Sequence, residues 1–84
     1  MKNSLNPNFI YSKKVAQALH FDAPVVALES TVITHGLPRP DNLNLAHDLE
    51  SIVYEESCVP ATIAMLSGKI HVGLTDEELA SLAE

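Results

Sequence analysis

The chain lacks most features of secreted and membrane proteins. Its single cysteine, Cys58, excludes an internal disulfide and is consistent with a reducing compartment. Nothing near Cys58 in sequence would activate its thiol, so a small packing role is the simpler interpretation. The apolar runs are only a few residues long, too short for a membrane span, and the opening residues lack the apolar core of a signal peptide. These absences predict a cytoplasmic protein with no membrane partner.

Glycine and basic residues are also scarce. The three glycines, Gly36, Gly68 and Gly73, stand far apart, so no glycine-rich loop is available to cradle a phosphate. Eleven acidic residues against five basic ones give a formal charge of -6, which would repel a phosphate backbone. We therefore expect no nucleic-acid polymer as a partner. The histidines form no pair at the spacing of a zinc-binding helix; they are His20, His35, His47 and His71.

Length and hydrophobic content set the size of the fold. Of the 84 residues, 46% are hydrophobic, which is ordinary for a globular protein, so disorder is not expected. A chain of this length makes at most one small domain, and it buries only about 60 to 65% of the surface that it exposes when unfolded. A strand that needs cover on both faces is therefore difficult to accommodate.

The most informative stretch is 25–40, which reads VVALESTVITHGLPRP. Four apolar residues, Val25 to Leu28, follow Pro24 without a polar break, a pattern typical of a strand buried on both faces in a parallel sheet. Glu29 would then stand at the carboxyl end of that strand, where ligand crevices open in α/β sheets. On the pattern alone, the simpler alternative is favoured, in which Glu29 marks only the point where the strand reaches water.

Before this strand, the sequence predicts a loose segment and a short helix. Residues 1–11 carry asparagines on both sides of Pro7 and are expected to be loose. Ser12 can cap a helix whose apolar side chains follow the three-and-four spacing of one helical face. The members of that face are Val15, Ala18 and Leu19.

After the strand, the pattern predicts a loop and the main helix. Residues Thr31 to Thr34 either extend the strand or turn away from it. Gly36 and the two prolines that follow it, Pro38 and Pro40, then make a rigid, irregular loop in which no helix starts early. A helix capped by Asp41 or Asn42 then extends to about Glu55. Its expected apolar stripe consists of Leu45, Ala46, Leu49, Ile52 and Val53.

The last third of the chain predicts a β-hairpin and a capped helix. Strands over 59–66 and 69–72 flank the turn signal Ser-Gly at 67–68. Thr75, with Glu78 three residues later, forms a capping-box pattern that starts a helix. The expected fold class is therefore α/β, with a helix, a buried strand, a helix, a strand pair and a helix. The doubly buried strand and the missing helix stop signal indicate part of a larger domain.

Two separate blocks of sequence point to a known family. They are ALESTVITHGLPRPDN at 27–42 and VPATIAMLSGKIHVGLTDEELASLA at 59–83. At this separation they resemble the amino-terminal third of the pseudouridine-5'-phosphate glycosidases, the indigoidine synthase A-like family. The resemblance begins near Ser12. It implies that residues 12–84 form an incomplete glycosidase-like domain, a fragment of an α/β/α sandwich.

The resemblance implies an enzyme that reversibly cleaves the carbon-carbon glycosidic bond of pseudouridine 5'-phosphate to uracil and ribose 5-phosphate. In the family, the glutamate of the ALEST block is the proton donor, which places that catalytic role on Glu29. Thr31, His35 and Gly36 match the same pattern and are expected to shape the substrate site. A carbon-linked base leaves poorly, so an acid has to protonate it or the ribose ring oxygen while a nucleophile takes the anomeric carbon.

The chain also departs from the family pattern. The family forms homotrimers and uses a divalent metal, usually Mn²⁺, but its metal-binding aspartate and its imine-forming lysine lie beyond the matched region and are missing from these 84 residues. We therefore assign no metal ligand and expect the chain alone to be inactive. Ser57-Cys58 stands where the family commonly has Gly-Ala, which would cost a left-handed helix cap about 1 kcal/mol. The alternative is a non-catalytic module that docks on a full-length paralogue through an open sheet edge.

Overall fold

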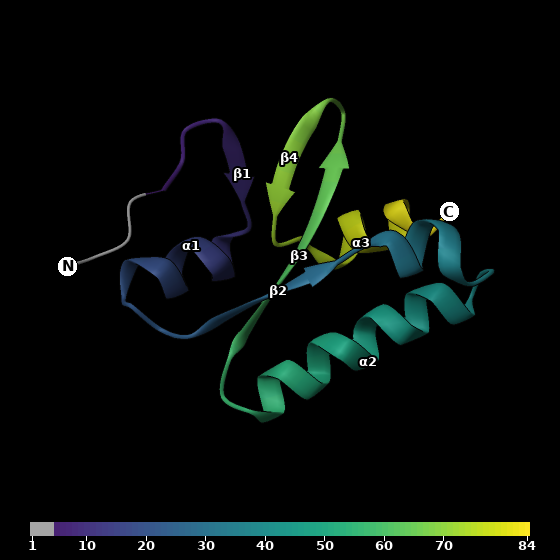
Figure 1. Cartoon of the computed structure of the whole chain (residues 1–84), viewed down its shortest axis with the longest axis horizontal. Helices are drawn as coiled ribbons and strands as arrows, with labels where there is room; N and C mark the ends of the chain where they lie inside the picture. Colours follow the sequence, from purple (N-terminus) through teal and green to yellow (C-terminus); the bar gives the residue numbers. More distant parts are fainter. Residues whose placement is uncertain (1–4) are drawn as a thin grey trace.

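The computed structural model describes residues 5–84 as a four-stranded sheet with packed helices (Figure 1). This arrangement confirms the predicted α/β class. None of the helices in these residues has the length and apolar character needed to cross a membrane. In chain order the elements are β1 (Phe9–Tyr11), α1 (Lys13–His20), β2 (Val25–Glu29), η1 (Val32–Gly36), α2 (Asp41–Glu55), β3 (Val59–Leu66), β4 (Lys69–Val72) and α3 (Asp76–Leu82).

The sheet has the strand order β1-β4-β3-β2 and mixed directions. β2 is parallel to β3, β3 is antiparallel to β4, and β1 is parallel to β4. The prediction that β2 is buried on both faces is wrong for residues 5–84, because β2 is an edge strand with Val26 and Ala27 exposed. An apolar strand is buried on both faces only where other elements pack on both faces. Residues 5–84 do not provide such elements around β2.

The predicted loose segment contains a strand. Its residues 1–4 lie outside the described part of the chain, but Phe9–Tyr11 form β1, so the prediction is wrong for these three residues. Phe9 pairs with Ile70 and Tyr11 with Val72. The pairing partner lies near the other end of the sequence, so local composition could not reveal the strand.

The predicted irregular loop begins with a short π-helical turn, η1. The carbonyl oxygen of Ser30 accepts hydrogen bonds from the backbone nitrogens of Ile33 and Thr34, at 2.9 and 3.2 Å. Residues 31–34 thus turn away from the strand, which was one of the two predicted alternatives, but the prediction that no helix starts early is wrong for residues 32–36. The prolines prevent helix only after Gly36, and burial of the Ile33 side chain stabilises the turn before them.

Two of the α-helices, α1 and α3, begin where the capping signals indicated. Ser12 caps α1, because its hydroxyl oxygen accepts a hydrogen bond from the Val15 nitrogen at 3.3 Å. At α3, the Glu78 nitrogen donates to the Thr75 hydroxyl at 3.1 Å, and the Thr75 nitrogen donates to the Glu78 carboxylate at 2.9 Å. This reciprocal pair is the predicted capping box.

The packed face of α2 differs from the predicted apolar stripe at one end. Ile52 is 56% exposed, so its assignment to the stripe is wrong. The helix is rotated toward polar side chains that find partners: Glu50 accepts a hydrogen bond from the Thr62 hydroxyl at 2.7 Å. Asn42 and Ala46, one helical turn apart, are buried on the same side. Polar contacts with neighbouring elements, which hydrophobic spacing cannot show, decide this rotation.

The main apolar core lies between η1, α2 and α3. Leu79 of α3 is almost fully buried. Partly buried leucines and a valine surround the cluster. The buried members of the cluster are Ile33, Ala46, Leu79 and Ala83.

A residue in left-handed conformation ends α2, as the family comparison predicted. Ser57 has a φ of 61°. Its backbone nitrogen donates to the Tyr54 carbonyl at 2.9 Å, and the Cys58 nitrogen donates to the Val53 carbonyl at 3.2 Å. These two bonds are the Schellman pattern of helix ends, at which glycine is the usual left-handed residue.

We expect Ser57→Gly to raise the free energy of unfolding by about 1 kcal/mol, because glycine adopts this conformation without the clash of a side chain. For a chain of this size, the gain corresponds to an increase in Tm of about 4–8 °C, measurable by circular dichroism. The matched control is Ser51→Gly inside α2, which should lower stability by about 0.5–1 kcal/mol. A loss of stability at both positions would show that Ser57 is not strained.

Candidate functional site

The predicted acid, Glu29, is exposed at the point where β2 ends. It pairs in register with Ile63 of β3. Side chains alternate between the two faces of a sheet, and paired residues on neighbouring strands share a face. Glu29 therefore lies on the same face as Ile63, whereas Thr62 points the other way, to its hydrogen bond with α2.

Thr31 orients the Glu29 carboxylate. Its hydroxyl donates a hydrogen bond to Oε1 of Glu29. The backbone of Thr31 is helical at the start of η1, so the turn itself holds the hydroxyl in place. Within residues 5–84, Oε2 of Glu29 accepts no hydrogen bond, so the carboxylate has one anchored oxygen and one that is available to a ligand.

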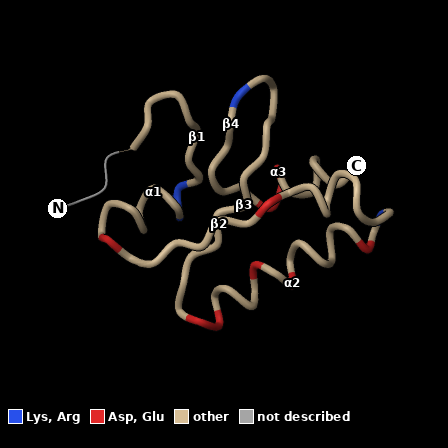
Figure 2. The backbone as a smooth tube through the Cα atoms, in the orientation of Figure 1, with Lys and Arg blue, Asp and Glu red and all other residues tan. Residues whose placement is uncertain are grey.

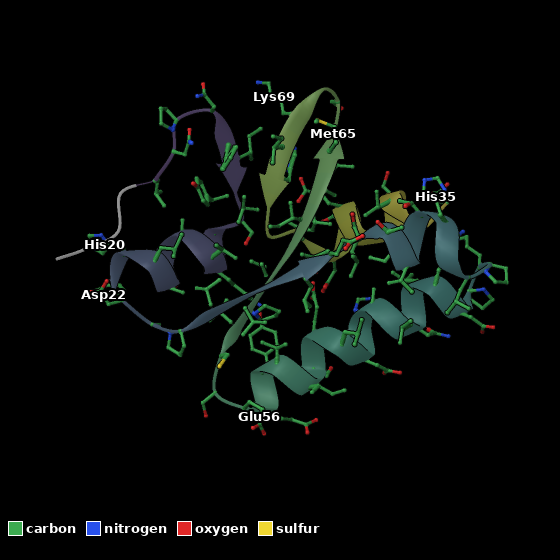
Figure 3. All side chains as sticks on the ribbon, in the orientation of Figure 1. His20, Asp22, His35, Glu56, Met65 and Lys69 are labelled. Atoms are coloured by element: carbon green, nitrogen blue, oxygen red, sulfur yellow. The ribbon has the colours of Figure 1, made fainter. Side chains whose placement is uncertain are left out.

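His35 and Gly36 lie at the far end of η1 from Glu29. Both are exposed, and His35 lies on the outside of the turn (Figure 3). A Cβ added at Gly36 would lie 3.0 Å from Cγ2 of Val32, so the turn is tight at this point. The four predicted site residues thus belong to one short segment, but within the described chain no hydrogen bond or ion pair joins His35 to Glu29.

Asn42 holds η1 in position, a role that the sequence analysis missed. Its side chain is 3% exposed. The amide nitrogen donates to the carbonyl oxygens of Ile33, at 3.0 Å, and of Ala83, at 2.8 Å. Its amide oxygen accepts from the Leu43 backbone nitrogen at 2.8 Å. One side chain therefore joins η1, the start of α2 and the end of α3.

The sequence predicted Asp41 or Asn42 as the cap of α2. That prediction is wrong, because Pro40 occupies the cap position and makes no side-chain hydrogen bond there. An asparagine near a helix start is typical of a cap. Asn42 does lie at the start of α2. Its amide nitrogen, however, donates to carbonyl oxygens of η1 and of the end of α3, which only the tertiary fold brings near.

The described residues do not supply a metal site or a lysine partner for Glu29. Figure 2 shows acidic residues spread along α2, while basic residues lie on α1, on the β3–β4 hairpin and in the loop before α2. Lys13, Lys14 and Lys69 form no ion pair with Glu29. Within residues 5–84, no three His, Cys, Asp or Glu side chains come together as ligands. The side chains present therefore do not fit the Mn²⁺ that the family resemblance implies.

A separate cleft of about 440 Å³ lies between α1 and α2. Several of its polar residues have partners; for example, Glu50 is bonded to Thr62, and Nζ of Lys14 lies 5.4 Å from the centre of the Tyr54 ring. Glu29 is not part of its wall. The cleft and the predicted acid therefore belong to different regions of the molecule.

Comparisons with known proteins support the resemblance. Residues 14–84 match a family model described as indigoidine synthase A like protein. A pseudouridine-5'-phosphate glycosidase of Thermosipho africanus is 58% identical over 73 residues, which cover 87% of this chain and 25% of that protein. The one of Mycoplasmopsis agalactiae is 51% identical over 77 residues, or 92% of this chain and 26% of that protein. The chain thus spans about a quarter of the length of these curated relatives, less than the predicted third.

Two solved structures share the fold. The prealnumycin C-glycosynthase AlnA, solved in complex with ribulose 5-phosphate, has a TM-score of 0.75 and 36% identity over 95% of this chain and 25% of its own. An indigoidine synthase A-like protein from Thermotoga maritima has a TM-score of 0.71 and 30% identity over 99% of this chain and 27% of its own. In both, the matching fold is one part of a chain about four times as long.

Proposed function

Because the chain belongs to the indigoidine synthase A-like family, we propose that it carries the acid part of a pseudouridine-5'-phosphate glycosidase site, with Glu29 as the proton donor. One observation supports this role above the others. Glu29 stands at the end of β2 with one carboxylate oxygen anchored by Thr31 and the other open. A fixed carboxyl group at the carboxyl end of a parallel strand is placed where ligands bind in α/β sheets.

The proposed chemistry explains why an acid is needed. When the bond between uracil and the ribose anomeric carbon breaks, its electron pair stays with uracil and a proton must be added there. Glu29 would supply that proton through Oε2, while Thr31 holds Oε1. A carboxyl group can donate only while it carries its proton, and removal of water from its surroundings favours that form. Glu29 is exposed in residues 5–84, so the proposed site is completed by further protein.

For the other site residues and for the assembly, the proposal is based on the family resemblance. We propose that His35 and Gly36 shape the substrate pocket through η1. We also propose that the complete enzyme uses Mn²⁺, is a homotrimer and acts in the cytoplasm on a small nucleotide. The residues that hold the metal and form the imine would come from protein beyond these 84 residues.

We expect the 84-residue chain alone to release no uracil. Cleavage also needs a nucleophile at the anomeric carbon, and none of the three described lysines pairs with Glu29. The test is to incubate the purified chain with pseudouridine 5'-phosphate and Mn²⁺ and to follow uracil by chromatography. Turnover that Glu29→Gln abolishes would refute the need for a lysine outside the chain.

A second candidate function is a non-catalytic module that docks on a full-length paralogue. It is favoured by the position of β2, which within residues 5–84 is an edge strand with one side of its backbone unpaired. Size-exclusion chromatography and pull-down with a complete homologue separate the candidates. A docking module binds the complete homologue, whereas an enzyme fragment does not, because its place in that homologue is already filled.

A further inference from the structure

Two rows of side chains on one face of the sheet are apolar across β1, β4 and β3, and one of these rows ends in Glu29 of β2. Strand register defines these two rows of neighbouring side chains. On β1, the rings of Phe9 and Tyr11 lie 6.4 Å apart, as expected for residues that share a face. We call this surface the Glu29 face. Its first row is Phe9, Ile70 and Met65, and its second is Tyr11, Val72, Ile63 and Glu29.

The Glu29 face is open at the end of β3 and along β4, where the opposite face is covered, whereas Ala61, earlier on β3, is buried. On β3, Met65 is 62% exposed and Ile63 is 38% exposed, whereas Ala64, between them, is buried against the helical side. His71, which pairs with Ala64, is also buried and lies 3.6 Å from the Glu78 carboxylate of α3. The alternation shows that helices cover one face of this part of the sheet and leave the other to solvent.

The apolar rows contrast with the surface of α2, which is suited to water. α2 carries several exposed acidic residues (Figure 2). On the Glu29 face, Glu29 is the one charged residue of the two rows. A shallow hollow of about 390 Å³ adjoins the first row, between Phe9, Met65 and Ile70. Met65 and Ile63 are exposed and the other apolar members of the rows are half-buried. An apolar surface that is left partly open to solvent is typical of a protein interaction site.

We propose that the Glu29 face is the docking surface for the polypeptide that corresponds to the three quarters of the family relatives that this chain does not match. The occupant follows from the comparisons: the same fold forms one part of AlnA and of the Thermotoga protein, each about four times as long. The additional protein must pack on this part, and the open apolar face is the surface suited to it. Because Glu29 ends one row, docking also surrounds the acid with the rest of the site.

This inference takes from the proposed function only the family to which the docking polypeptide belongs. The experiment is to co-express the 84-residue chain with a tagged polypeptide comprising the unmatched three quarters of the Thermosipho africanus relative. We expect the two to purify together as a soluble complex. Binding is measured without substrate. A complex that forms but releases no uracil from pseudouridine 5'-phosphate would refute the acid role of Glu29 and leave the docking surface intact.

Two matched variants locate the interface. Met65→Lys places a charge in the first row and should reduce co-purification at least tenfold, whereas Ile52→Lys, at a similarly exposed apolar residue on α2, should leave it unchanged. Both positions are exposed, so neither variant should unfold the chain; circular dichroism checks this. The proposal would be overturned if Ile52→Lys, and not Met65→Lys, reduced co-purification. It would also be overturned if the tagged polypeptide stayed insoluble or unbound in the presence of the wild-type chain. Self-association of the chain alone that Met65→Lys abolishes would assign the face to a second copy instead.

Discussion

Asn42→Leu is expected to lower the free energy of unfolding by about 2–4 kcal/mol, the largest stability effect that we predict. Leucine has the same branched shape, with slightly larger terminal groups, but cannot donate to the Ile33 and Ala83 carbonyl oxygens, which would remain buried without their present partner. Each buried polar group left without a partner costs about 1–3 kcal/mol. Urea denaturation followed by circular dichroism measures the loss.

Asn44→Leu is the matched control, because Asn44 lies on the same helix but is exposed. Its substitution should change stability by less than about 0.5 kcal/mol. Asn42→Asp should be at least as damaging as Asn42→Leu, since a carboxylate oxygen would face two carbonyl oxygens. Equal effects at positions 42 and 44 would show that Asn42 does not hold the elements together.

The consequence of losing Asn42 reaches the candidate site. Asn42 is bonded to Ile33 in the middle of η1, and Thr31 at the start of η1 orients Glu29. A substitution that releases η1 would therefore also release the carboxylate. We infer that Asn42 is a positioning residue for the acid.

Elements defined by neighbours in sequence could be predicted. The capping box of Thr75 and Glu78 and the hairpin turn at Ser67-Gly68 depend on residues within one turn of chain, and both formed where expected. The left-handed conformation of Ser57 was predicted from the family resemblance, in which glycine commonly stands near this position, and its hydrogen bonds are also local. In each case the interaction that forms the structure is local.

Elements defined by distant partners could not be predicted. β1 forms because β4 lies beside it, and the buried role of Asn42 depends on Ala83 at the other end of the chain. The exposure of β2 had a related cause, because an apolar sequence does not state whether a covering layer is present. The composition of a short segment does not show which distant residues it will contact.

The candidate site divides in the same way. The position of Glu29 at the end of a strand followed from the apolar run before it. Its role as acid came from the resemblance to a family and not from the pattern. The face to which it points could not be predicted, because that depends on the register of β2 against Ile63 of β3.

The central claim is that Glu29 is the proton donor of a glycosidase site completed by further protein. The most direct measurement uses a chimera in which this chain replaces the matched segment of the Thermosipho africanus relative, with which it shares 58% identity over 73 residues. We expect the chimera to release uracil from pseudouridine 5'-phosphate. Glu29→Gln should lower that rate by about 100- to 10 000-fold, the usual contribution of a general acid.

The matched control is Glu55→Gln, at an exposed glutamate at the end of α2, which should leave the rate unchanged. The decisive measurement is therefore the ratio of uracil release by the Glu29→Gln and Glu55→Gln chimeras. A ratio below about 1:100 is the predicted result. Equal rates for the two variants would contradict the assignment of Glu29 as the acid.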